Sequence, residues 1–137
     1  MTEYKKMKVL VADDDERLAR PDLVDALKEL GFQEIYEASD GSEAYDMFLQ
    51  KNPDIILLDT EMPDSYGYNI CRRIRSQPEG QRIKIIGMSN TPTREYSEKW
   101  NAAGVDYFAD KVRFFDPDYY GDPDFSLECI IQRVLRK

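Results

Sequence analysis

The sequence predicts an α/β fold, a doubly wound five-stranded parallel sheet with helices on both faces. Short apolar segments typical of buried strands alternate with amphipathic segments of helical period, which gives five strand–helix units. Such alternation favours parallel strands joined by right-handed helical crossovers. A chain of 137 residues is long enough to bury a hydrophobic core. We therefore expect residues 1–137 to form a single domain.

Five segments are predicted as strands because they are short and apolar and have turn residues beside them. The third contains the run Ile55-Ile56-Leu57-Leu58, as expected of a strand that is buried on both faces. In chain order, the predicted strands cover residues 7–12, 34–38, 54–58, 82–88 and 105–109.

Five helices follow these strands, and capping residues indicate several of their ends. Pro21 lies inside the first helix, where we expect a kink or a restart. Thr91 with Pro92 fits the start of the fourth helix, and Asp122 with Pro123 fits the start of the last. The predicted helices cover residues 15–30, begin at 40–41, cover 66–76, run from 91 to 103 and run from 122 to 136.

The amino-acid composition excludes several classes of function. The 27 acidic and 19 basic residues give a formal charge of −8, which opposes binding to nucleic-acid phosphates. The absence of histidine excludes Ser-His-Asp and Cys-His catalytic sites and any histidine-bound metal. Cys71 and Cys129 are interpreted as small buried apolar residues in a reducing compartment. No segment is typical of a signal peptide or a membrane span, so we expect a cytoplasmic protein without membrane partners.

Polar residues suited to phosphate chemistry follow four of the predicted strands. They are Asp13, Asp14 and Asp15 after the first strand, Asp59 after the third, Ser89, Asn90 and Thr91 after the fourth, and Asp110 and Lys111 after the fifth. In doubly wound sheets, ligands bind outside the carboxyl ends of the strands. Carboxylates gathered there suit Mg²⁺, and a lysine and a hydroxyl suit phosphoryl oxygens. An aspartate so placed can become an acyl phosphate.

Four motifs, VLVADD, DIILLDTEMPDSYG, IIGMSN and GVDYFADK, occur in this order at the ends of predicted strands. In order and spacing they resemble the receiver domain of two-component response regulators, over residues 8–136 and in a single-domain form similar to the chemotaxis regulators. The resemblance implies a flavodoxin-like strand order of 2-1-3-4-5.

The resemblance also implies a role for each motif residue. Mg²⁺ would be the cofactor, held directly by Asp14, through water by Asp13, and by the backbone carbonyl of Glu61, with Asp59 completing the metal site. The phosphoryl chemistry would use Asp59 as phosphoacceptor, Ser89 as hydrogen-bond donor and Lys111 as ion-pair partner, and Phe108 would be the aromatic switch.

These residues also have structural interpretations, which stay open at the level of sequence. An aspartate that closes a strand, such as Asp59, is ordinarily a turn residue, and Asp13 and Asp14 are acceptable as acids at a helix N-terminus. Ser89 is equally suited to begin a capped helix, and Lys111 to be a surface lysine.

Several residues depart from the family pattern. Val112 replaces the proline that usually follows the lysine, so no cis bond is expected and Lys111 would be held less firmly. Asn90 replaces an alanine or glycine, and Glu61 adds a carboxylate. Together these two changes predict an altered phosphoryl lifetime of undetermined sign. Phe108 lacks a hydroxyl, so its coupling to the site would be steric, and its structural alternative is an ordinary core aromatic.

Two aromatic features lie outside the motifs. The segment 112–124, VRFFDPDYYGDPD, is interpreted as a surface loop whose aromatic residues cover the end of the core. A docking patch for a partner is the alternative. Trp100 is interpreted as half-buried packing rather than as a binding anchor.

The function predicted from the resemblance is that of a stand-alone phosphoacceptor in a two-component phosphorelay. A sensor histidine kinase or a histidine phosphotransfer protein would donate the phosphoryl group. A downstream protein would bind the face formed by the fourth helix, the fifth strand and the last helix. The domain could also form a homodimer when it is phosphorylated. Self-phosphorylation and slow dephosphorylation would be its only chemistry, so it is not expected to be an enzyme.

Two other functions remain open from the sequence. Asp13 and Asp15 form the Asp-x-Asp pair of a small phosphohydrolase similar to the haloacid dehalogenases, although the chain is short for that family. The other alternative is a receiver-like binding module that acts without phosphorylation.

Overall fold

The computed structural model describes residues 3–115 and 126–137. Its centre is a five-stranded sheet in which every strand pairs in parallel with its neighbours, in the order β2-β1-β3-β4-β5. The predicted fold class and strand order are therefore confirmed. The strands are β1 (Lys8–Ala12), β2 (Glu34–Ala38), β3 (Ile55–Asp59), β4 (Lys84–Ser89) and β5 (Tyr107–Asp110).

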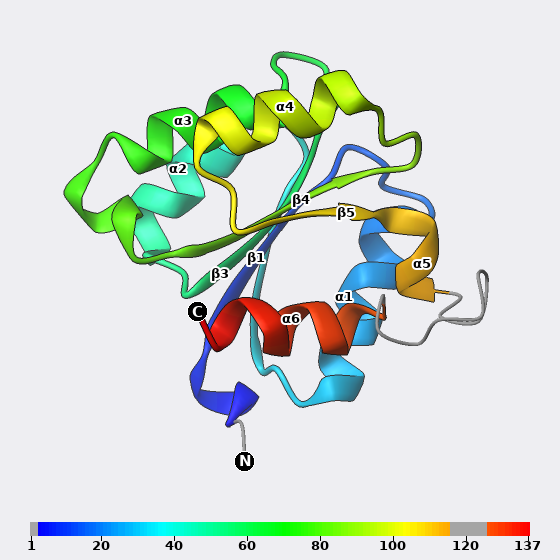
Figure 1. Ribbon diagram of the computed structural model, residues 1–137. Helices are drawn as coiled ribbons and strands as arrows, with labels where there is room; N and C mark the ends of the chain where they lie inside the picture. The colour runs from blue at the N-terminus through cyan, green and yellow to red at the C-terminus, as the bar shows by residue number, and fades with distance from the viewer. Residues whose placement is uncertain (1–2, 116–125) are drawn as a thin grey trace.

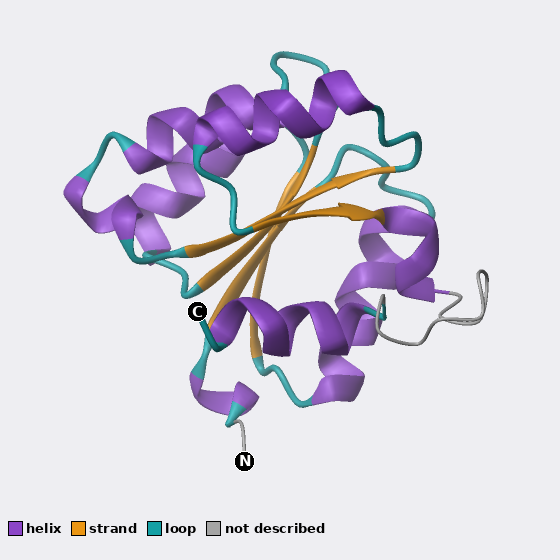
Figure 2. Ribbon diagram, in the orientation of Figure 1, coloured by secondary structure: helices purple, strands orange, loops and turns teal. Residues whose placement is uncertain are grey.

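Helices cover both faces of this sheet (Figure 1). In the described residues these are α1 (Ala19–Leu30), α2 (Gly41–Lys51), α3 (Gly67–Arg75), α4 (Arg94–Ala103), α5 (Lys111–Phe115) and α6 (Leu127–Leu135). Helices α2, α3 and α4 lie on one face, and α1 and α6 on the other (Figure 2). Short 3-10 turns occupy Tyr4–Lys6 and Pro78–Gln81.

Strand β3 shows why a continuous apolar run forms the centre of the fold. Side chains alternate across a strand, so Ile55 and Leu57 join the cluster beneath α1 and α6. Ile56 and Leu58 join the cluster beneath α2, α3 and α4. All four are fully buried, as expected of a parallel strand with a helical layer on each side.

The first helix begins later than the sequence predicts. A carboxylate oxygen of Asp15 accepts hydrogen bonds from the backbone N–H groups of Arg17 and Leu18, at 3.1 Å each, and this turn delays α1 until Ala19. Pro21 then lies in the first helical turn, where a backbone N–H needs no partner within the helix. The position therefore requires neither the kink nor the restart that we expected.

The predicted start of the fourth helix is wrong because another hydroxyl caps that helix, and the described part of the last helix has its own cap at Ser126. Thr93, and not Thr91, caps α4, with its Oγ1 accepting the backbone N–H of Tyr96 at 3.1 Å. Ser126 caps α6 by accepting the backbone N–H of Cys129 at 3.3 Å. Asp122, the predicted cap, lies outside the described residues.

Helix α5 occupies part of the segment that was predicted as a loop. Phe114 on this helix is buried in the core cluster with α6, which agrees with the structural interpretation for that one residue. The rest of the predicted loop, from residue 116 onward, lies outside the described residues. Cys71 is buried as predicted, Cys129 is only partly buried, and neither is in a disulfide.

Trp100 on α4 is fully buried, which corrects the expectation of half-buried packing. Its indole lies over glycines, because a Cβ atom at Gly87 would come within 2.7 Å of the ring and one at Gly67 within 3.0 Å. The indole N–H donates to Thr60 Oγ1 at 3.0 Å. Thr60 Oγ1 in turn donates to the carbonyl of Met88 at 2.7 Å, so both polar atoms are satisfied inside the core.

We expect Gly87→Ala to lower the free energy of unfolding by about 1–3 kcal/mol, because the added methyl group overlaps the indole of Trp100. Urea denaturation measures this change. In a Trp100→Phe background the same substitution should cost clearly less, because the smaller ring leaves room for the methyl group. An equal cost in both backgrounds would contradict this account of the packing.

Candidate functional site

Each predicted site residue except Phe108 lies at the carboxyl end of the sheet, around one cavity of about 400 Å³. The backbone pairing of the strands continues into this edge, since Asp13 N–H donates to Ala38 O at 3.0 Å and Thr60 N–H to Met88 O at 2.9 Å. The pairing of the strands therefore fixes the backbone positions from which the acidic side chains extend. The cavity is lined by Asp13, Asp14, Asp15, Asp59, Glu61, Met62, Pro63, Ser89, Asn90, Thr91 and Lys111.

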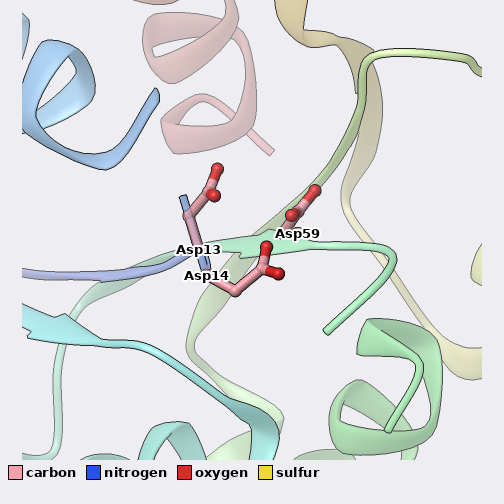
Figure 3. A group of neighbouring side chains, drawn as sticks. All are labelled: Asp13, Asp14 and Asp59. Atoms are coloured by element: carbon pink, nitrogen blue, oxygen red, sulfur yellow. The ribbon is translucent and has the colours of Figure 1, made fainter. Parts of the chain in front are cut away.

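Three carboxylates converge in this cavity (Figure 3). One oxygen each of Asp13, Asp14 and Asp59 lies within 4.8 Å of the other two. Asp13 is fully buried and Asp59 nearly so, whereas Asp14 is exposed to solvent. A compact set of carboxylate oxygens open to water on one side fits the preference of Mg²⁺ for a few oxygen ligands and retained waters.

Lys111 places a cation against two of these carboxylates. Its Nζ lies 2.7 Å from Asp13 Oδ2 and 3.3 Å from Asp59 Oδ1, and its side chain is only 4% exposed. Burial disfavours the charged amine, but the carboxylates of Asp59 and Asp13 outweigh this effect and raise the pKa of Lys111. The peptide bond to Val112 is not cis, as expected, yet two ion pairs hold the lysine.

The buried position of Asp59 changes its acidity. Burial is the largest cause and the negative charge of Asp13 adds to it, while Lys111 and the backbone N–H of Thr60 act in the opposite direction. The result raises the pKa of Asp59 to about 7. In the metal-free site this carboxyl group is therefore close to half-protonated at neutral pH.

The loop after β4 supplies a hydroxyl to the cavity. Ser89 is buried, and its Oγ accepts the backbone N–H of Thr91 at 3.0 Å, which forms a turn rather than the start of a helix. The Ser89 hydroxyl proton remains available for a ligand in the cavity. Asn90 is exposed at the rim of the same cavity.

The Glu61 side chain has a partner that the sequence did not indicate. The hydroxyl of Tyr96, on α4, donates a hydrogen bond to Glu61 Oε1. This bond is the largest cause that raises the pKa of Tyr96 to about 12, so the phenol stays protonated as a donor. The two residues are 35 positions apart in the sequence, which leaves no sequence signal for the contact.

Phe108 lies away from the acidic cavity. It is partly buried on β5, and its ring stacks on the indole of Trp100 with centroids 6.1 Å apart. Thr60, next to Asp59, bonds the same indole. The aromatic residue is thus connected to the site by Trp100 and Thr60, two residues to which the sequence analysis gave no functional role.

Comparison with known proteins decides the family. The pattern described as "Response regulator receiver domain" matches residues 9–115. The chain belongs to the response regulator receiver family. No helix in the described part of this receiver domain is long and apolar enough to cross a membrane.

Curated relatives of this receiver domain are longer proteins. The "Probable transcriptional regulator ycf27" of Guillardia theta is 32% identical over 134 residues, which are 96% of this chain and 46% of the relative. The "Response regulator MprA" of Mycobacterium avium is 35% identical over 128 residues, 93% of this chain and 49% of the relative. The chain therefore spans about half the length of these relatives.

Solved structures share the fold. The receiver domain of the histidine kinase CKI1 from Arabidopsis thaliana, complexed with Mg²⁺ and BeF₃⁻, has a TM-score of 0.81 at 25% identity, over 98% of this chain and 93% of that one. The chemotaxis response regulator CheY4 of Vibrio cholerae has a TM-score of 0.74 at 24% identity, over 94% of this chain and 99% of that one.

The arrangement does not favour a phosphohydrolase built on Asp13 and Asp15. Both oxygens of Asp13 have partners, because Oδ2 contacts Lys111 Nζ at 2.7 Å and Oδ1 accepts the backbone N–H of Asp15 at 2.9 Å, so neither is free to act as a nucleophile. Asp15 uses its carboxylate to hold the turn before α1. Asp59 is the buried carboxylate with a raised pKa, and it faces the same cavity as Ser89 and Lys111.

We expect the metal-free protein to lose stability as the pH rises from about 4 to 7, because the folded pKa of Asp59 exceeds the unfolded value of about 3.9. The folded state binds more protons in this window, so Asp59→Asn should be more stable than wild type above pH 7, by roughly 2–4 kcal/mol. Urea denaturation with a chelator at about pH 4.5 and about pH 8 measures the difference.

The control is Asp46→Asn, which changes an exposed carboxylate on α2. It should show no comparable gain at either pH. An Asp59→Asn gain of the same size at both pH values would mean that the ionisation of Asp59 is not the cause.

Proposed function

We propose that Asp59 accepts a phosphoryl group, with Mg²⁺ as cofactor, from the phosphohistidine of a sensor histidine kinase or a histidine phosphotransfer protein. The observation that carries this proposal is the convergence of three carboxylates within 4.8 Å beside the buried amine of Lys111. We treat residues 1–137 as one receiver domain whose chemistry is limited to gaining and slowly losing this group. The unpaired cysteines support placing the exchange in the reducing cytoplasm.

The transfer is a displacement at phosphorus. Asp59 Oδ1 is held by Lys111 and by the backbone N–H of Thr60 at 3.0 Å, which leaves Oδ2 as the attacking oxygen. A bond forms from Oδ2 to phosphorus as the phosphorus–nitrogen bond of the donor breaks, and the electron pair of that bond stays on the imidazole. Ionised Asp59 is the reactive form, and a second cation near it favours this form.

The residues around Asp59 have distinct parts in this step. Mg²⁺ held by Asp13, Asp14, Asp59 and the backbone carbonyl of Glu61 would neutralise charge on the phosphoryl oxygens. Lys111 already contacts Asp59 Oδ1, so a small shift brings its amine onto a phosphoryl oxygen. The Ser89 hydroxyl can donate to another oxygen while its Oγ keeps the N–H of Thr91.

The signal would leave through the face formed by α4, β5 and α6. Recruitment of Ser89 by the phosphoryl group would draw the loop after β4 inward, and this loop leads into α4. Phe108 would move with it through its stacking on Trp100, which shifts the balance between two existing conformations. A downstream protein, or a second phosphorylated copy of this domain, would then bind that face.

The experiment that tests this function is incubation of the chain with Mg²⁺ and acetyl phosphate, a small phosphodonor, followed by intact-mass measurement and mapping of the adduct. We expect a single hydroxylamine-labile phosphoryl group on Asp59, absent in Asp59→Asn and after chelation of the metal. The matched control, Asp46→Asn, should be modified as wild type is. Modification at another residue would contradict the site. A folded wild type that takes up none would favour the phosphorylation-independent binding module.

We expect Lys111→Met to bind Mg²⁺ more tightly, by roughly three- to tenfold, because the amine that competes for Asp13 and Asp59 is gone. Phosphoryl uptake should fall by roughly a hundredfold, because the charge opposite the phosphoryl oxygens is lost. Isothermal titration calorimetry gives the affinity and mass spectrometry the uptake. Circular dichroism with Mg²⁺ present checks the fold, and weaker Mg²⁺ binding by a folded variant would contradict this role.

A further inference from the structure

Glu61 stands between two hollows at the surface. One is the acidic cavity of about 400 Å³, and the other, of about 610 Å³, lies over the loop between β3 and α3. Glu61, Met62 and Pro63 line both. The Glu61 carboxylate is exposed and does not belong to the cluster of Asp13, Asp14 and Asp59. The site therefore has a carboxylate at its rim in addition to this cluster.

The backbone of Glu61 is held firmly, so only its side chain is free to turn toward either hollow. Glu61 forms an antiparallel bridge with Tyr66. On either side of it, Met62 N–H donates to Ser65 O at 3.2 Å and Gly67 N–H donates to Thr60 O at 2.7 Å. The position of the carboxylate thus depends on what its side-chain oxygens bind.

Tyr96 is the residue that binds this carboxylate. Its backbone N–H donates to Thr93 Oγ1 in the cap of α4. Its ring packs against the rings of Tyr66 and Tyr68, with centroids 6.3 and 6.4 Å away. A ring anchored on these sides presents its hydroxyl to Glu61 in one direction.

We propose that Tyr96 is a positioning residue for phosphoryl transfer, because its hydroxyl holds the Glu61 carboxylate at the rim and keeps an additional negative charge away from Asp59. This inference rests on the proposed function and adds a residue to it. Without the hydroxyl, Glu61 is free to rotate into the acidic cavity. The extra charge there would attract Mg²⁺ and repel an anionic phosphodonor.

The test is Tyr96→Phe, which removes only the hydroxyl. We expect Mg²⁺ to bind more tightly and acetyl phosphate to modify Asp59 more slowly, each by roughly two- to fivefold. Calorimetry measures the first without any phosphodonor, and time-resolved intact mass measures the second. In a Glu61→Gln background, Tyr96→Phe should change neither quantity, because no carboxylate remains to be released.

Tyr36→Phe is the matched control. The Tyr36 hydroxyl donates to Glu34 on β2 at 3.0 Å, a bond of the same kind in the same chain that lies outside the acidic cavity. Its loss should leave both measurements at the wild-type values.

The outcomes separate this inference from the proposed function. Tyr96→Phe effects of equal size in the wild-type and Glu61→Gln backgrounds would show a general packing role, and no effect would also overturn the inference. Both results leave phosphorylation of wild type intact. If wild type gains no phosphoryl group, the proposed function fails, while the Mg²⁺ affinities still decide whether Tyr96 positions Glu61.

Discussion

The contact between Lys111 and Asp13, 2.7 Å long and shielded from water, is the interaction on which the rest of the site depends. Burying Asp13 and Asp59 together is costly unless a cation is fixed beside them. The two partners are 98 residues apart, one after β1 and one after β5, so the ion pair forms only when the sheet is complete. The fold thus creates an acidic cavity and also supplies the cation that offsets the cost of burying its carboxylates. The same amine lies within reach of a group bound at Asp59.

A second consequence of the sheet is a chain of contacts that links the residue next to Asp59 to strand β5. The Thr60 hydroxyl donates to the backbone of β4 and accepts the indole N–H of Trp100. The ring of Phe108 stacks on that indole. The indole fits only because Gly87 and Gly67 have no side chains. A fully buried aromatic with its polar atom satisfied has little freedom to move alone. Displacement of α4 would therefore move Phe108 as well. Such packing would pass a conformational change on to β5 instead of damping it.

Features that depend on local sequence pattern could be predicted from the sequence. Features that depend on a choice between two similar residues, or on a contact between distant segments, could not. Strand alternation and the residues that follow each strand predicted the sheet and the members of the acidic cavity. The start of α4 was missed because Thr91 and Thr93 both suit a cap, and the choice depends on the turn that Ser89 makes with Thr91. The contact of Tyr96 with Glu61 was also missed, because it depends on the final packing of α4 against the loop after β3.

The residues around the acidic cavity form a buried inner set and an exposed rim, and Asp14 belongs to the exposed residues. Asp13, Asp59, Ser89 and Lys111 are buried, and each is tied to its place by an ion pair or a hydrogen bond. Two of the residues that depart from the family pattern, Glu61 and Asn90, are exposed at the rim of the cavity. If Asp59 is phosphorylated as proposed, a substitution at the rim would alter the charge and the access of water there without leaving a buried charge unpaired. Differences in phosphoryl lifetime can therefore arise at the rim at little cost in stability, whereas a change among the four inner residues affects folding and chemistry together.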